Sequence, residues 1–274
     1  SYFEYGRLAG GNIERILRED DTTVYYTYDL ADRLVDEDWR ASDHSQLYAF
    51  SYDYDAAGNR TKENKDGTSV YYYYDAANQL TEKQQGGGST YYEYADNGLV
   101  SKVAPACDSP SEFRYDARMQ RFAINFAGTY AYFAWDGMNQ LVEKDISGTR
   151  VARHTHGATP IEGIGSIVES SRYQSCNLQY PHYDHRGSLF NLEDSAAQDL
   201  EVEYNAFGEE ISRSGNAATR LGYQGTAWMR LSSGLYVSPV RLYLPTSGRF
   251  GRRDPLMLLR SLREDPRATE TTLV

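Results

Sequence analysis

A short unit recurs along this chain: an aromatic residue, a spacer, a second aromatic residue and, in most copies, an aspartate. The second aromatic residues of six copies follow at steps of 26, 20, 20, 21 and 20, at Tyr28, Tyr54, Tyr74, Tyr94, Tyr115 and Trp135. Two more copies start at Tyr183 and Tyr204, 21 residues apart. A unit of about 20 residues cannot bury an apolar face alone, so the chain is predicted to be a stack of repeats that share a core.

Each unit has the pattern of a β-hairpin. Aromatic residues at i and i+2 lie on the same face of a strand. A sequence such as Asp55-Ala-Ala-Gly58 suits a tight turn, because aspartate accepts bonds from nearby amides and glycine tolerates a positive φ. The period leaves no room for a crossover helix, so the predicted fold class is all-β, a strip of antiparallel hairpins. No helix longer than about three turns is expected before Pro255.

The tyrosines are predicted to form rows on one face of the strip. The chain has 25 tyrosines against 9 phenylalanines and 3 tryptophans, an excess typical of cross-strand aromatic ladders. The rows should contain the pairs Tyr26 and Tyr28, Tyr52 and Tyr54, Tyr72 and Tyr74, and Tyr92 and Tyr94.

Charge and cysteine content exclude several classes of protein. The net charge of −11 leaves no whole-chain basic footprint for nucleic acid and disfavours an anionic membrane surface. Two cysteines cannot build a disulfide-dense scaffold or a four-cysteine zinc site. The most apolar stretch, residues 122–135, is shorter than the roughly 20 residues that span a bilayer. The chain begins inside the repeat pattern, so it is expected to be a piece of a longer protein.

The second half carries an ordered set of motifs that resembles the Rhs/YD-repeat family, which includes Rhs polymorphic toxins, the B and C components of Tc toxins and the YD shells of teneurins. The motifs are HYDHRGSL at 182–189, EYNAFGE at 203–209, LGYQG at 221–225, GLY at 234–236, RLYLPTSGRF at 241–250 and RDP at 253–255. They resemble the repeat-associated core of that family. Asn205 and Leu244 stand where the family usually has aspartate.

The resemblance implies a strip of hairpins curled into part of a hollow shell or barrel, which encloses a cargo or is sealed by a plug. Residues 1–180 would be the YD-repeat strip, 181–255 the repeat-associated core, and 256–274 a short arginine-rich tail with an amphipathic helix at its start. At about 4.8 Å per strand, 24 to 27 strands close into a ring about 40 Å across, too small to wrap a folded domain comfortably. The chain is therefore expected to be an arc of a larger shell, or a compact curl that encloses only its own tyrosines.

Several residues are weak candidates for chemistry. Asp254 and Asp265 could form an autoproteolytic carboxylate pair, but the glycine-rich stretch that the family places between two Asp-Pro sites is absent, and turn residues are the favoured interpretation. Neither a cofactor site nor a metal site is predicted, although imidazoles can bind zinc or copper. The histidines are His44, His154, His156, His182 and His185. A disulfide between Cys107 and Cys176 depends on a geometry that the sequence does not give. Asn59 begins a glycosylation sequon inside a repeat turn, where a structural role is favoured.

These observations favour a non-enzymatic structural shell segment that encapsulates or displays a cargo, in a bacterial protein that is secreted or at the cell surface. Two alternatives stay open: a carbohydrate- or cell-surface-binding module that uses exposed tyrosines, and the remnant of a self-cleaving aspartyl autoprotease. The expected partners are the remainder of the parent protein or copies of the chain, joined by strand-edge pairing, with carbohydrate as a further candidate. Charged residues could instead protect the edges, among them Glu14, Arg15 and Arg18.

Overall fold

The computed structural model describes most of the chain. The described ranges are 3–117, 120–126, 128–136, 139–156, 167–172, 177–184, 187–195, 199–217, 219–224, 229–231, 234–238 and 241–251. All statements below concern these residues.

The described residues form 24 strands and one turn of 3-10 helix, Pro245–Ser247. The strands are β1 (Phe3–Arg7), β2 (Ile13–Arg18), β3 (Thr23–Tyr28), β4 (Leu34–Arg40), β5 (Gln46–Tyr54), β6 (Arg60–Lys65), β7 (Thr68–Tyr74), β8 (Leu80–Gln85), β9 (Gly88–Tyr94), β10 (Val100–Pro105), β11 (Ser111–Tyr115), β12 (Arg121–Phe126), β13 (Thr129–Asp136), β14 (Asn139–Lys144), β15 (Arg150–His156), β16 (Ile167–Arg172), β17 (Asn177–Tyr183), β18 (Leu189–Asp194), β19 (Leu200–Tyr204), β20 (Glu210–Gly215), β21 (Met229–Arg230), β22 (Tyr236–Val237), β23 (Leu242–Leu244) and β24 (Arg249–Phe250). The predicted all-β fold is confirmed for this part of the chain.

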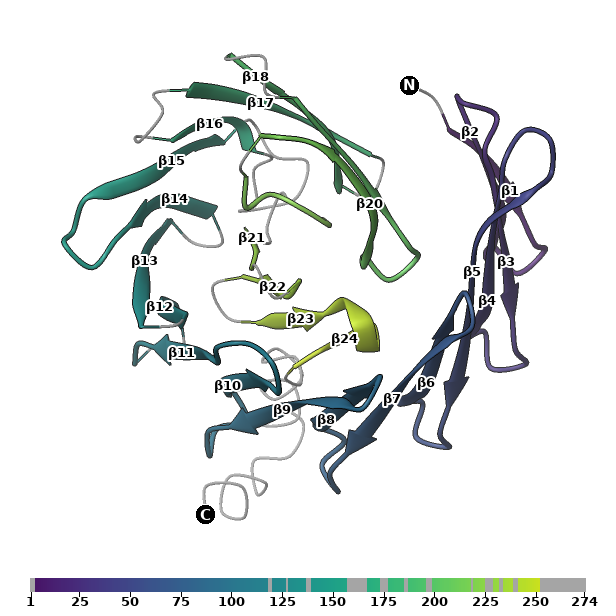
Figure 1. The fold of residues 1–274 in the computed structure, drawn as a ribbon, viewed down its shortest axis with the longest axis horizontal. Helices are drawn as coiled ribbons and strands as arrows, with labels where there is room; N and C mark the ends of the chain where they lie inside the picture. The colour runs from purple at the N-terminus through teal and green to yellow at the C-terminus, as the bar shows by residue number, and fades with distance from the viewer. Residues whose placement is uncertain are drawn as a thin grey trace, which may run out of the picture.

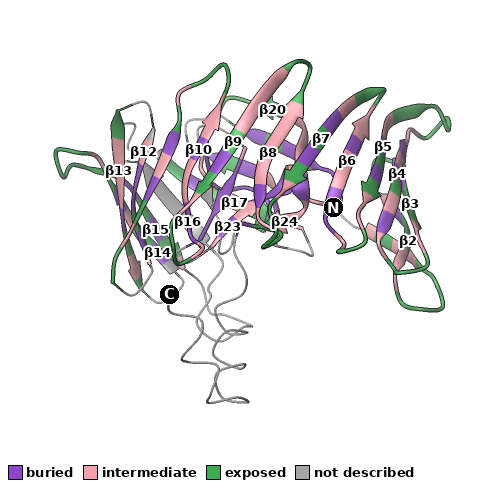
Figure 2. Cartoon of the chain, turned by 90° about the horizontal axis from the view of Figure 1, so that it is seen from below, coloured by how far each residue is buried: buried purple, intermediate pink, exposed green. Residues whose placement is uncertain are grey.

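The first 20 strands make one continuous antiparallel meander, in which each strand pairs with the next along the chain. The strip curls into an open ring that brings β20 round toward β1 and β2 (Figure 1). In the view turned by 90°, the hairpins lie side by side and form the wall of a short tube (Figure 2). The predicted boundary at residue 180 lies within β17, and the sheet continues through it.

The repeat turns share one geometry. Gly58 donates its backbone N–H to the carbonyl of Asp55 and adopts φ +80°, while Asp55 accepts the amide of Asn59 on its own carboxylate. The register shifts at the strand end, between Asp53 and Tyr54, which is the bulge expected when a left-handed residue ends a short hairpin loop. Asn78 occupies the same left-handed position in the next repeat, at φ +59°. The predicted aspartate-to-glycine turn is therefore confirmed.

The first aromatic residue of each pair is buried inside the ring, and the second is half-buried beside it. Tyr52, Tyr72 and Tyr92 are each less than 10% exposed, so the predicted rows on one face are confirmed. The intervening residues point outward, and tyrosines at such positions are exposed, for example Tyr71 and Tyr73.

In seven repeats, the second aromatic residue, or the histidine in its place, donates a hydrogen bond to a carbonyl at the start of a strand in the preceding unit. The Tyr74 hydroxyl, for example, reaches the carbonyl of Arg60 at 2.8 Å. The same contact, at 2.7–2.9 Å, joins Tyr28 to Ile13, Tyr54 to Leu34, Tyr94 to Leu80, Tyr115 to Val100, Trp135 to Arg121 and the His156 ring to Gln140. A buried carbonyl left unpaired at a bulge would be costly, so this position selects an aromatic residue with a donor and not phenylalanine.

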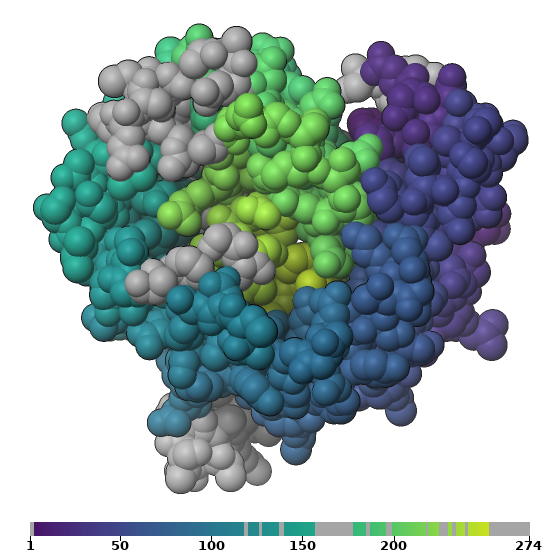
Figure 3. Space-filling view, in the orientation of Figure 1, coloured from purple at the N-terminus to yellow at the C-terminus, as the bar shows by residue number. Residues whose placement is uncertain are grey.

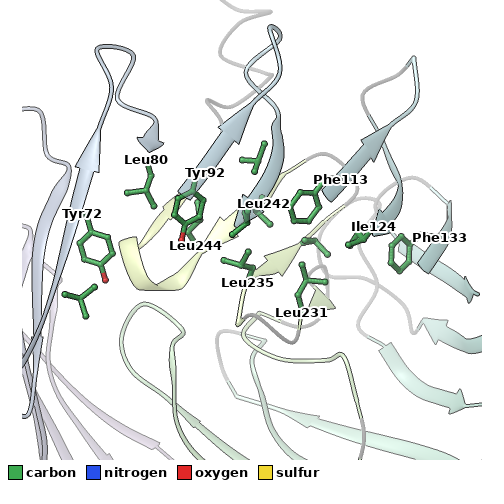
Figure 4. Packing of buried hydrophobic residues seen from close by; sticks show 14 residues of the cluster. Tyr72, Leu80, Tyr92, Phe113, Ile124, Phe133, Leu231, Leu235, Leu242 and Leu244 are labelled. Atoms are coloured by element: carbon green, nitrogen blue, oxygen red, sulfur yellow. The ribbon is translucent and has the colours of Figure 1, made fainter. Parts of the chain in front are cut away.

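A second, four-stranded sheet of β21 to β24 lies inside the ring (Figures 1 and 3). Its side chains Leu231, Leu235, Leu242 and Leu244 pack against the inner face of the wall, on residues that include Tyr72, Leu80, Tyr92, Phe113, Ile124 and Phe133 (Figure 4). The core thus lies between the wall, which is the sheet of β1 to β20, and the inner segment, which is the described part of residues 229–251 and contains β21 to β24. Leu244, where the family resemblance predicts aspartate, is 1% exposed in this core, which explains why an apolar residue stands there.

No helix in the described ranges is both long and apolar enough to cross a membrane.

Candidate functional site: the closing turn and its contacts with the wall

The turn between β19 and β20, residues 205–209, reaches from one end of the strip to the inner face of the other end. We call it the closing turn. Its backbone repeats the geometry of the other turns: Asn205 Oδ1 accepts the amides of Phe207 and Glu209, each at 3.0 Å. Gly208 adopts φ +89°, and a Cβ there would lie 2.3 Å from the ring of Tyr223. The residues that contact this turn come from further along the chain, where Tyr223 and Tyr243 donate to the carbonyls of Ala206 and Phe207, and from β4 to β7, more than 130 positions away in sequence.

The carboxylate of Glu37 on β4 receives the closing turn. The amide of Ala206 donates to both Glu37 oxygens, at 2.9 and 3.1 Å. Trp39 Nε1 donates to Oε1 at 2.7 Å, and the Tyr52 hydroxyl donates to Oε2 at 3.2 Å. Glu37 is 1% exposed, so these bonds replace the water that the charge has lost.

Asn205 explains a departure from the family pattern. It is fully buried and precedes the amide that binds Glu37. An aspartate there would place a second negative charge beside the buried Glu37 carboxylate, whereas the amide oxygen of Asn205 accepts the same two backbone bonds without charge.

Arg60 on β6 fixes the closing turn and the inner sheet to the wall. Its guanidinium lies 3.8 Å from the ring centroid of Phe207 and 4.4 Å from that of Tyr52, and the two rings meet edge to face at 5.0 Å. Arg60 Nη1 donates to the carbonyl of Thr246 at 2.9 Å. A Cβ on Gly248 would lie 2.7 Å from Arg60 Nη2 and 2.6 Å from Phe207, so a side chain there would push both away.

A second arginine repeats this role on the opposite part of the ring. Arg121 on β12 is fully buried, and its Nη1 donates to the carbonyls of Ser238 and Arg241 in the inner segment. Its Nη2 donates to the Tyr115 hydroxyl at 3.0 Å. Arg60 and Arg121 occupy one register position, opposite the second aromatic residue of their repeats. The same position holds an apolar residue in other repeats: Leu34, Leu80, Val100 and Leu189.

Two carboxyl groups meet beside Arg60. Glu63 on β6 lies 3.6 Å from Arg60 and accepts the Tyr72 hydroxyl at 2.8 Å. Burial, and then the charge of Glu209 from the closing turn, raise the pKa of Glu63 to about 7. Burial and the nearby Glu63 also hold the pKa of Tyr72 well above its usual range, so its hydroxyl stays a donor. A cavity of about 220 Å³ opens at this point, with Glu63 and Glu209 both in its lining.

The two ends of the strip meet at a seam, where they are joined by side chains. Among the described strands, β1 pairs only with β2 and β20 only with β19. Arg18 of β2 forms an ion pair with Glu203 of β19 across the seam. A cleft of about 570 Å³ lies along it, between Phe3 on one side and Phe190 on the other.

Sequence reasoning pointed to other residues. Asp254, Asp265, Cys176 and His185 lie outside the described residues, so the autoproteolytic pair and the disulfide stay untested; Cys107 is exposed.

The remaining candidates have structural surroundings. His156 belongs to the row of aromatic-to-carbonyl bonds, and His182 faces Glu193 at 3.3 Å. In the described ranges no three or more His, Cys, Asp or Glu side chains are grouped to hold a metal ion. Asn59 is 1% exposed and donates from Nδ2 to Asp55 and Asn78, which confirms its structural role in the turn.

Sequence reasoning missed Glu37, Arg60 and Arg121. The signal that could have found the arginines is their place in the repeat alignment, where arginine replaces an apolar residue in two copies. Glu37 has no such signal, because its partner amide is 169 residues away.

No family model matches this chain, and no curated protein matches it. Among solved structures, the chain is similar to the TcdB2–TccC3 complex without its hypervariable C-terminal region, with a TM-score of 0.47, 15% identity, and coverage of 92% of this chain and 18% of that one. It is also similar to the TcdB2–TccC3 complex, with a TM-score of 0.45 and the same identity and coverage. A Photorhabdus luminescens Tc holotoxin pore gives a TM-score of 0.41, 15% identity and the same coverage. The chain thus spans less than a fifth of these structures.

Proposed function

We propose that this chain is a non-enzymatic structural segment of an Rhs/YD-type shell, and that it serves to seal a shell and to display or enclose a cargo of its parent protein or assembly. The observation that supports this is the architecture of the ring. A continuous 20-stranded meander is closed on itself by contacts between the closing turn and side chains of the wall, and is filled by the four-stranded inner sheet.

The filled interior favours sealing over enclosure by this chain alone. The space-filling view shows residues of the inner segment across the centre of the ring (Figure 3). A cavity of about 340 Å³ lies between the wall and the inner segment, and one of about 220 Å³ lies between the wall and the closing turn, whereas a folded domain of 100 residues is about 33 Å in diameter. A cargo would therefore lie against this ring, inside a space that other strands complete.

The proposal assigns the partner to the free strand edges. The outer edge of β1 and that of β20 have no backbone partner among the described residues, and exposed edges are templates for pairing with another strand. We propose the remainder of a parent protein, or a second copy of the chain, as the partner, and a secreted or cell-surface location.

Light scattering over a concentration series tests the association. We expect a mass above that of the monomer, or stable binding of a neighbouring segment of the parent protein. A monomer mass at high concentration, together with no binding to that segment, would contradict edge pairing. Intact mass measured over time, with Asp254→Asn as the control, tests the non-enzymatic assignment: a cleavage that wild type undergoes and the variant does not would contradict it.

A second candidate function, carbohydrate binding, is favoured by one observation on the outer face. Tyr71, Tyr73 and Tyr91 are 43–52% exposed on β7 and β9. Tyr73 and Tyr91 flank Glu82 of β8 from opposite sides, so their backbones are about 10 Å apart. Exposed rings beside polar groups are suited to stack on sugar rings.

A glycan array and sedimentation with insoluble polysaccharide test this candidate. We expect Tyr73→Ala to abolish retention and Tyr25→Ala, an exposed tyrosine on distant β3, to leave it unchanged. Equal retention of both variants, or no retention of wild type, would contradict it.

A further inference from the structure

Glu63 and Glu209 form a carboxyl pair at the point where the closing turn meets the wall. Glu63 is 2% exposed, and its Oε2 accepts the Tyr72 hydroxyl. Its Oε1 is buried without a donor. Glu209 lies in the lining of the same cavity, and its negative charge is the second cause, after burial, that raises the pKa of Glu63. Glu209 can donate to Glu63 only if one of the two carboxyl groups carries a proton.

The surrounding charges do not remove the need for that proton. Arg60 is the cation nearest to Glu63, at 3.6 Å, but its Nη1 is directed to the Thr246 carbonyl and its face lies on Tyr52 and Phe207. One guanidinium thus faces two carboxyl groups. The other titratable or charged groups around the pair are Glu37 on β4, Tyr52 on β5, Lys65 and Asp66 at the end of β6, Tyr72 on β7, Lys83 on β8, and Glu210 and Arg230 at the adjoining cavity.

Electrostatics favours a single charge on the pair. Two carboxylates that line one small cavity repel each other, and near a buried group water screens that repulsion poorly. Burial first, and the neighbouring Glu209 second, raise the pKa of Glu63 to about 7, while Arg60 and the Tyr72 hydroxyl act in the opposite direction. The proton is therefore held at pH values where an exposed glutamate has lost it.

We propose that Glu63 and Glu209 share one proton, and that this proton acts as a latch that holds the closing turn against the wall and weakens ring closure when it is lost. On opening, both carboxyl groups reach water and the proton leaves through the adjoining cavity. The latch belongs to the ring itself, so it holds whether or not the ring forms part of a larger shell.

The direction follows from proton linkage. The closed ring binds the proton more tightly than the open ring, so the stabilising effect is fully present below the ordinary glutamate range, about pH 4.5, and is lost as the pH rises through about 7. Between about pH 5 and pH 8 the equilibrium constant for opening of the turn should rise roughly 10- to 100-fold.

Hydrogen exchange of the backbone amides of residues 206–209 measures this opening, after correction for the intrinsic pH dependence of exchange. We expect the protection factors of wild type to fall by that factor over the range. Glu209→Gln removes the neighbouring charge, so its pH dependence should be weaker than that of wild type, although burial still raises the pKa of Glu63. Glu201→Gln, an exposed carboxylate on the adjacent β19, is the matched control and should behave as wild type.

A flat profile in wild type, or an unchanged slope in Glu209→Gln, would overturn the proposal. If Glu209→Gln does not fold, Glu63→Gln provides the same comparison. Infrared spectroscopy of wild type adds an independent measurement: a protonated carboxyl band that is present at about pH 5.5 and disappears near neutrality supports the latch, and its absence at about pH 5.5 contradicts it.

Discussion

Replacement of Arg60 by leucine tests whether the buried arginines fix the inner segment to the wall. Leucine is the residue that three other repeats place at this register position, at Leu34, Leu80 and Leu189, so the hairpin itself should form normally. What is lost is the contact with the inner segment: the hydrogen bond to the Thr246 carbonyl and the position of the guanidinium over Phe207.

The magnitude follows from these contacts. A hydrogen bond from a charged group contributes about 1.5–3 kcal/mol. A desolvated cation over aromatic rings contributes about 2 kcal/mol. Removal of one partner of a buried ion pair can cost a further 3–5 kcal/mol, but Glu63 already binds a proton near pH 7 and can become neutral, so most of that cost is avoided. We expect Arg60→Leu to lower the free energy of unfolding by about 3–5 kcal/mol.

Urea unfolding at pH 6.5, followed by tryptophan fluorescence and circular dichroism, measures the change. Arg15→Leu is the control, because the side chain of Arg15 on β2 is 44% exposed and pairs with the exposed Glu4 on the neighbouring strand. The control should cost less than about 1 kcal/mol. A loss below about 0.5 kcal/mol for Arg60→Leu, or equal losses for both variants, would refute the role of Arg60 as an anchor.

Three further predictions concern the repeat turns and the aromatic rows. In urea unfolding, Tyr74→Ala should lower the free energy of unfolding by about 3 kcal/mol and Tyr74→Phe by about 1 kcal/mol. The difference arises because phenylalanine keeps the packing and loses only the hydroxyl bond. Equal losses would show that the hydroxyl alone matters. Gly208→Ala should lower the stability measured in a thermal melt by at least about 3 kcal/mol, because the new Cβ would lie 2.3 Å from a tyrosine ring. Gly58→Ala, at φ +80° with open space around it, should cost about 1 kcal/mol, and the reverse order would contradict the closing-turn geometry. The backbone amide of residue 33 is the main cause that holds the pKa of Asp29 below its usual range. The Asp29 carboxylate therefore stabilises the fold above about pH 4, and this contribution is lost as the pH falls. In an acid titration of stability, Asp29→Asn should be less sensitive to pH than wild type.

The sequence allowed prediction of whatever depends on neighbours within one or two repeats. The turn at Asp55 to Gly58 follows from the conformations that these two residues tolerate, and the row of Tyr52, Tyr72 and Tyr92 follows from strand alternation. Both are local rules, repeated at a fixed period, so errors at one unit do not propagate to the next.

The closing contacts could not be predicted in the same way. The bond from Ala206 to Glu37 joins residues 169 positions apart, and it forms only because twist and curl of the strip bring β19 back to β4. No periodicity carries that information. The departures from the repeat do carry part of it: Arg60, Arg121 and Asn205 each break the local pattern, and each lies where the wall meets the inner segment or the closing turn.

Closure by side chains has a consequence for how this ring opens. At the seam, Arg18 and Glu203 form a partly exposed ion pair, which contributes about 0–1 kcal/mol. The free energy of closure is therefore concentrated in the contacts of the closing turn with Glu37, Arg60 and Glu63. Each hairpin of the wall keeps its own ladder and its aromatic-to-carbonyl bond when these contacts break, so the ring can open at the seam as a local event without unfolding the strip. A strip closed by backbone pairing of β20 with β1 would lack that freedom, because opening would then require a full ladder of hydrogen bonds to break at once.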